Sequence, residues 1–81
     1  MKNTISNAVV NRINFLLGKN GMTVYELSQK AGIPYPTMKS LMQKRTKSID
    51  FKNVILIAYG FDMTPSEFIN DCSFSIDNLD I

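Results

Sequence analysis

Histidine is absent from this sequence, and cysteine occurs once, as Cys72. These two residue types supply the commonest catalytic bases and zinc ligands, so their scarcity removes most enzyme and metal-site chemistries. The seven carboxylates have no paired spacing, and no glycine-rich loop suited to phosphate is present. We therefore expect no enzymatic activity, no metal and no cofactor. A single cysteine also cannot form an internal disulfide, which fits a reducing cytosol.

Long apolar runs are absent as well. No segment approaches the roughly 18 consecutive apolar residues that a membrane span requires. Residues 1–10 mix Asn, Thr and Ser and lack the apolar stretch of a secretory signal. With 44% apolar and 20% charged residues among 81, the composition is that of an ordinary globular domain. These features predict one small cytoplasmic domain with no membrane association.

Basic residues are missing from the later part of the chain. Residues 53–81 contain five acids and no base, a net charge of −5, whereas residues 1–52 contain all nine bases and two acids, a net charge of +7. Such sorting indicates that one end of the molecule faces a polyanion, such as nucleic acid, while the other end is turned away. A solvated surface whose charges happen to be sorted is the alternative.

The spacing of apolar residues predicts a first helix over residues 7–19. Ser6 is suited to cap the start of this helix, and Gly21 to end it. Thr23 then begins a second helix, because Glu26 follows three residues later and completes a capping box.

A glycine-containing turn separates the second helix from a third. Gly32 can adopt the left-handed conformation that ends the second helix, and the third begins within residues 34–36, since prolines are tolerated in a first turn. One side of the third helix is apolar, and the other carries no acid. The polar side consists of Pro36, Lys39, Ser40, Gln43 and Lys47, with Thr37 and Lys44 on its flank. Two short helices joined in this way are typical of a helix-turn-helix, although an ordinary helical hairpin is the alternative.

Two further helices are predicted after a basic loop. Asp50 is suited to cap a fourth helix that runs through Tyr59 and ends at Gly60. Residues 64–67 form a second capping box, with proline at the first helical position, and begin a fifth helix that ends near Asn70.

Two apolar segments admit more than one interpretation. Residues 54–58 are apolar on every side of the fourth helix, which indicates either deep burial or a self-association surface on the fourth and fifth helices. Residues 72–81 show no helical period. This segment either frays, docks its apolar side chains on a groove or extends as a short strand across a dimer. We expect a packed tail.

Between residues 23 and 41 the chain reads TVYELSQKAGIPYPTMKSL, which resembles the core of the Xre/Cro type of repressor helix-turn-helix. Residues 55–61 and 64–68 are similar to the later helices of the same family, and the resemblance covers roughly residues 8–70. It implies an all-α fold. The expected architecture is a five-helix, repressor-like DNA-binding domain over residues 1–71, followed by a C-terminal tail over residues 72–81.

The resemblance also implies which side chains meet DNA. The start of the recognition helix reads base edges in this family, which here implies Tyr35, Pro36, Thr37 and Ser40. Phosphate contacts are implied for Thr23, Val24, Lys39, Gln43, Lys44, Arg45 and Lys47. Val24 departs from the family's usual polar residue and offers only its backbone N–H. Strong base readers such as Arg, Asn and Gln are missing from the first turn, so we expect modest specificity or reliance on DNA shape.

The functional expectation is a sequence-specific, double-stranded-DNA-binding transcriptional regulator. We expect a repressor that occupies an operator as a homodimer. The candidate self-association surface comprises Ile57, Phe61, Phe68 and Phe74. The alternative is a protein-interaction module on the same fold, either antitoxin-like or an accessory protein of a mobile element. Such a module would bind a protein partner through the acidic C-terminal region.

Overall fold

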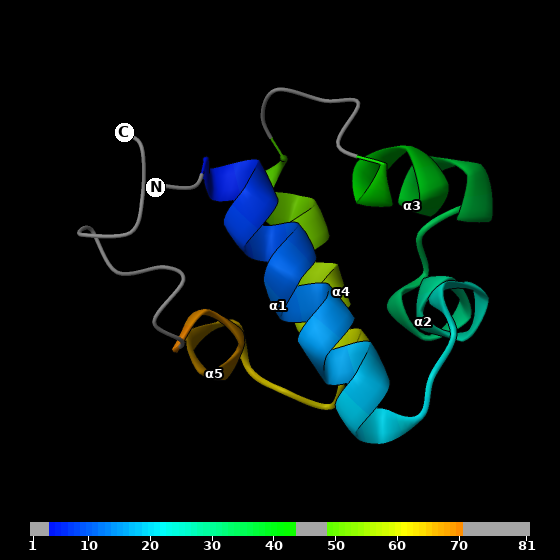
Figure 1. Cartoon of the computed structure of the whole chain (residues 1–81). Coiled ribbons are helices and arrows are strands. Elements are labelled where there is room, and N and C mark those ends of the chain that lie inside the picture. Colours follow the sequence, from blue (N-terminus) through cyan, green and yellow to red (C-terminus); the bar gives the residue numbers. More distant parts are fainter. Residues whose placement is uncertain (1–3, 44–48, 71–81) are drawn as a thin grey trace.

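Five α-helices and no strand make up the described part of the chain (Figure 1). The computed structural model describes residues 4–43 and 49–70. In chain order the helices are α1 (Ile5–Asn20), α2 (Val24–Ala31), α3 (Tyr35–Met42), α4 (Phe51–Gly60) and α5 (Pro65–Ile69). The expected all-α, five-helix fold is confirmed, while the predicted tail over residues 72–81 lies outside the described residues. In Figure 1, α1 runs through the middle with α4 behind it, α5 lies on one side, and the α2–α3 pair lies on the other.

Helix α1 begins two residues earlier than the sequence predicts. Thr4 is its N-cap, because its backbone is extended and its hydroxyl accepts a hydrogen bond from the backbone N–H of Asn7 at 3.1 Å. The predicted cap, Ser6, is wrong: it lies inside the helix and is buried. The predicted end is confirmed, since Gly21 adopts the left-handed conformation with φ of 61°.

Gly60 has a different role from the one predicted. It is the last residue of α4 rather than its stop signal, and the positive φ after this helix, 59°, belongs to Asp62. A Cβ atom at Gly60 would lie 2.9 Å from Leu27 Cδ1 and 3.3 Å from both Ala31 Cβ and its backbone nitrogen. The glycine therefore allows α2 and α4 to pack closely, which a sequence pattern cannot distinguish from helix termination.

The second capping box forms as predicted at the start of α5. The Thr64 hydroxyl accepts from the Glu67 N–H at 3.2 Å, and the Thr64 N–H donates to Glu67 Oε1 at 2.9 Å. Hydrogen bonds from the Thr64 backbone, and then from its side chain, hold the pKa of the Glu67 carboxyl below its ordinary value. Arg12 of α1 secures the other end of this short helix, because its Nε donates to the Phe68 carbonyl at 2.9 Å.

The core contains three of the four residues that were proposed as a self-association surface. Ile57 and Phe68 are 0% exposed and Phe61 is 8% exposed within one chain. These side chains already have apolar partners in the core, so the prediction that they form a dimer surface is wrong. Phe74, the fourth member of that set, lies outside the described residues. Deep burial, the first interpretation of residues 54–58, is confirmed for Val54, Ile57 and Ala58.

Over the described ranges, no helix has the length and apolar character needed to cross a membrane.

Candidate nucleic-acid interface

Residues at both ends of the turn between α2 and α3 fix its conformation. Gly32 has φ of 71° and ends α2 in the predicted left-handed conformation. The N–H of Ile33 donates to the Ser28 carbonyl at 3.1 Å, and the Ile33 side chain is buried. Pro34 then occupies the cap position of α3. The turn therefore fixes how α3 leaves α2 (Figure 1).

Helix α3 has one buried side and one solvent side, as predicted. Met38 and Leu41 are buried, at 0% and 7% exposure, and anchor the helix to the core. Tyr35, Pro36 and Thr37 are exposed at the other side of its first turn. Among the described residues, no side chain caps the start of α3. A helix held in this way can present its first turn to a groove.

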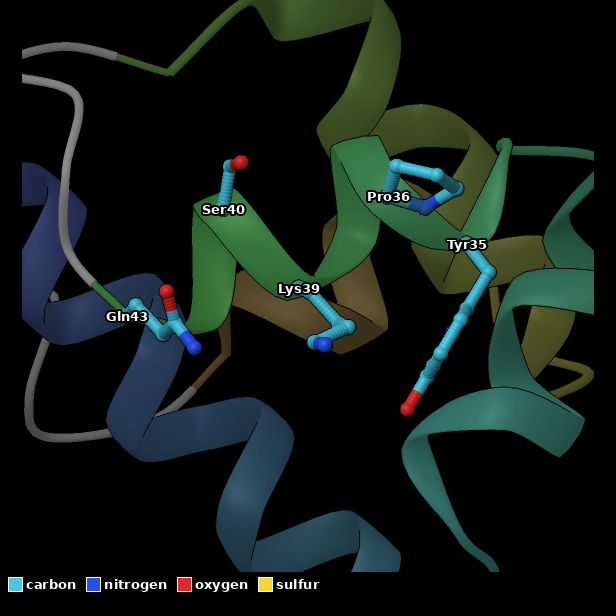
Figure 2. Close-up of a pocket in the computed structure, with 5 residues that line it drawn as sticks. All are labelled: Tyr35, Pro36, Lys39, Ser40 and Gln43. Carbon is cyan, nitrogen blue, oxygen red and sulfur yellow. The ribbon is translucent and has the colours of Figure 1, made fainter.

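An open hollow of about 320 Å³ lies along the solvent side of α3. Its lining residues are Tyr35, Pro36, Lys39, Ser40 and Gln43 (Figure 2). In Figure 2, Pro36 and Ser40 point to the same side of the helix, whereas Tyr35 extends away from them. Ser40 is half-buried, and Thr37 is exposed but outside the hollow. Three of the four implied base-facing residues, Tyr35, Pro36 and Ser40, therefore line this hollow, and Thr37 does not.

The start of α2 is partly occupied by its own capping box. The Thr23 hydroxyl accepts from the Glu26 N–H at 3.1 Å, and the Thr23 N–H donates to Glu26 Oε1 at 3.2 Å. Val24 is half-buried and packs against the core. A phosphate at this end would therefore use the backbone N–H groups of Val24 and Tyr25, with the Glu26 carboxylate as an unfavourable neighbour.

The residues of α3 and the segment after it that are implied to bind phosphate fall into two groups, those that the structure describes and those that it does not. Lys39 is exposed on α3, and its Nζ lies 5.7 Å from the centroid of the Tyr35 ring. Gln43 is exposed at the C-terminal end of the same helix. Lys44, Arg45 and Lys47 lie outside the described residues. The described basic surface of α3 therefore rests on Lys39.

Sequence reasoning missed Tyr25. This residue of α2 is 55% exposed, and its ring meets that of Tyr35 edge to face. A separation of ten residues across a turn gives no periodic signal, so the contact appears only once the turn is built. The sequence itself shows only a tyrosine near the start of the second predicted helix, ten residues before Tyr35.

The residues described here contain no group of three or more His, Cys, Asp or Glu side chains that could hold a metal ion.

A second open hollow lies away from α3, and its lining is mainly apolar. It is formed by Phe51, Pro65, Ser66, Glu67, Ile69 and Asn70 of α4, α5 and the residue after α5. Its most exposed apolar members are Phe51, at 63%, and Ile69, at 47%.

Comparison with known families shows the family to which the chain belongs. The model of the Cro/C1-type HTH DNA-binding domain matches residues 12–71. The chain belongs to this family. The match runs from within α1 past the end of α5 and therefore contains the α2–α3 pair, two short helices joined by a tight turn. No curated protein matches the chain.

Membership gives the coarse function. The family is one of DNA-binding domains, and this is the function that membership gives the chain. In helix-turn-helix proteins generally, the second helix of the pair enters the major groove. The resemblance stated from residues 23–41 is thereby confirmed at the level of the family.

Proposed function

We propose that this Cro/C1-type chain is a sequence-specific transcriptional regulator that binds double-stranded DNA in the cytoplasm and represses by occupying an operator. One observation carries the proposal. The first turn of α3 exposes Tyr35, Pro36 and Thr37, while Met38 and Leu41 hold the opposite side of the same helix in the core. A buried anchor beneath an exposed, acid-free surface is what base reading from a single helix requires.

Base contacts would come from hydroxyl and apolar groups. Thr37 and Ser40 can donate or accept one hydrogen bond, and the Thr37 methyl and the Pro36 ring can contact a thymine methyl. None of these groups makes the two-pronged contact with guanine or adenine that arginine or asparagine makes. Specificity should therefore be modest and should draw on DNA shape.

Phosphate contacts would supply most of the affinity. Lys39 on α3 and the basic residues Lys44, Arg45 and Lys47 that follow it offer four positive charges close together in sequence. Each neutralised phosphate releases counterions, so binding should weaken steeply as salt rises.

Two copies would be needed to read a two-fold operator. The longest extent of the molecule is 33 Å, close to the roughly 34 Å that separates neighbouring half-sites in helix-turn-helix complexes. One chain presents one copy of α3, so a second copy would be needed for the second half-site. We infer a homodimer on DNA, and sedimentation velocity with and without a duplex measures the assembly directly.

Selection from a randomised duplex pool tests the proposed function. The purified protein is mixed with the pool at moderate salt, and the retained duplexes are sequenced. We expect a two-fold motif with half-sites about one helical turn apart. An unenriched pool would contradict sequence-specific binding.

Transcription in vitro then tests repression. The selected motif is placed across a promoter or, as a control, well upstream of it. We expect fewer transcripts only when the motif overlaps the promoter, because the bound protein and polymerase compete for the same DNA. Equal or increased transcription from the overlapping arrangement would contradict a repressor.

A protein-interaction module is the second candidate function. The apolar hollow on α4 and α5, with Phe51 and Ile69 exposed beside it, favours protein contact over DNA contact. This function would lead if the selection yielded no motif while the protein still formed a stable complex of defined stoichiometry with another chain.

A further inference from the structure

Two tyrosines from different helices meet at the surface of the α2–α3 pair. Tyr25 is the second residue of α2 and Tyr35 is the first residue of α3, so their contact joins the starts of both helices across the turn. The ring centroids are 5.3 Å apart, and the ring planes meet at 76°. Aromatic pairs favour this edge-to-face geometry, because the positive edge of one ring meets the negative face of the other.

Core packing does not explain the pair. Tyr25 is 55% exposed and Tyr35 is 37% exposed, whereas α2 and α3 already pack through buried side chains such as Leu27 and Met38. The two rings therefore lie at the edge of the packed core, and part of each ring faces solvent. The pair instead lies on the solvent side of the helix-turn-helix, beside the residues that we propose to read bases.

The Tyr35 ring is restrained by more than one neighbour. The edge-to-face contact comes from Tyr25, and the Lys39 ammonium lies 5.7 Å from the centroid of the Tyr35 ring. The backbone of Tyr25 is itself held, since the buried Ser28 hydroxyl donates to the Tyr25 carbonyl at 2.6 Å. Figure 2 shows Tyr35 extending away from Pro36 and Ser40, which leaves those two residues clear of its ring.

We propose that Tyr25 is a positioning residue of the DNA interface, whose ring fixes the ring of Tyr35 in the orientation that meets the duplex. The inference rests on the proposed function and extends the interface from α3 onto α2. Its benefit is preorganisation, because a side chain that is already ordered loses less conformational freedom on binding. Tyr25 adds no formal charge, so its removal should affect specific binding and leave the general attraction to DNA unchanged.

A double-mutant cycle tests this role. Wild type, Tyr25→Ala, Tyr35→Ala and the double variant are titrated by fluorescence anisotropy with the selected duplex and with a scrambled duplex of equal length and composition. We expect Tyr25→Ala to weaken binding to the selected duplex by about three- to tenfold, the range typical of an aromatic pair. The double variant should bind no more weakly than Tyr35→Ala alone. Tyr25→Phe should keep wild-type affinity, because it keeps the ring.

Tyr59→Ala is the matched control. Tyr59 is 60% exposed on α4, so this variant loses the same kind of side chain at a comparable exposure outside the α2–α3 pair. This variant should bind the selected duplex and the scrambled duplex with wild-type affinity. The melting temperature of Tyr25→Ala should stay close to that of wild type, which separates positioning from a folding defect.

Three results would overturn the inference. If Tyr25→Ala bound the selected duplex as tightly as wild type, the Tyr25 ring would have no role in binding. If the fold-loss of affinity in the double variant equalled the product of the two single fold-losses, Tyr25 would contact DNA independently of Tyr35. Equal loss on both duplexes would make its role non-specific. If wild type selected no motif at all, the proposed function and this inference would fall together. If wild type selects a motif but the effects of the Tyr25 and Tyr35 substitutions are independent, only the positioning role of Tyr25 is contradicted.

Discussion

At the residue scale, Thr37 tests whether the first turn of α3 reads bases. Thr37 is exposed and makes no contribution to the buried core, so Thr37→Ala should leave the fold intact. We expect the preference at one base step to weaken by about two- to tenfold, the loss of one hydrogen bond. A repeated selection with the variant measures this preference. An identical motif of identical strength would show that the recognition surface lies elsewhere.

Gly60 tests the close packing of α2 and α4. An added methyl would meet the buried Leu27 side chain at 2.9 Å and the Ala31 backbone nitrogen at 3.3 Å. Overpacking of this kind costs about 1–3 kcal/mol, against about 0.5–1 kcal/mol gained by removing a helical glycine. We therefore expect Gly60→Ala to lower the free energy of unfolding, as measured by urea denaturation.

Gly18→Ala is the matched control for that substitution. Gly18 is exposed within α1, and an added Cβ would meet nothing within 4 Å. This variant should gain about 0.5–1 kcal/mol of stability. If Gly60→Ala gained as much, the packing argument for Gly60 would be wrong.

Single residues were predictable wherever their chemistry acts locally. The exposed face of α3 follows from the positions of Met38 and Leu41, since a helix buries one side. The contact between Tyr25 and Tyr35 does not follow, because it depends on the angle that the turn sets between two helices. Contacts of this kind become visible only in three dimensions.

At the scale of elements, the α5 capping box predicts a pH dependence. The pKa of Glu67 is lowered from 4.5 by its bonds with Thr64, so the ionised form stabilises the fold. That contribution is fully present above the unfolded pKa and is lost as pH falls through the lower, folded pKa. Glu67→Gln should therefore melt below wild type at pH 7, and the difference should shrink as pH falls below about 4.5. A difference that stayed constant over this range would contradict a charge-dependent cap.

Helix boundaries show what local signals can and cannot decide. Both capping boxes form where the sequence predicts them, because residue types and spacing specify their hydrogen bonds. Ser6 and Thr4 are both acceptable caps, and the pattern did not favour the earlier one. In the sequence, Gly60 is compatible with helix termination and with close helix packing, and the structure shows close packing against α2.

At the scale of the whole molecule, the sorted charges predict how salt acts on binding. Lys44→Gln should weaken binding to the selected and scrambled duplexes by a similar factor, because a phosphate contact carries no sequence information. The slope of log affinity against log salt should become shallower by about one. Anisotropy titrations at several salt concentrations measure that slope. A loss confined to the selected duplex would instead make Lys44 a base reader.

The core of the molecule sets the limit of sequence reasoning about assembly. Apolar residues such as Ile57 and Phe68 fit a core and an interface equally well in sequence, and only the fold shows that one chain buries them. Phe51 and Ile69 are apolar too, yet they remain exposed. Which apolar residues face outwards is decided by how five helices pack together, and no single helix pattern contains that information.

Sequence-specific DNA binding through the exposed turn of α3 is the function that we propose for this Cro/C1-type chain. The most direct measurement compares the affinities of the wild-type protein for the selected and scrambled duplexes at physiological salt. We predict a ratio near the lower end of the range for specific regulators, on the order of a thousandfold, because the reading turn lacks strong base readers. A ratio near one, with the same salt slope on both duplexes, would contradict sequence-specific binding.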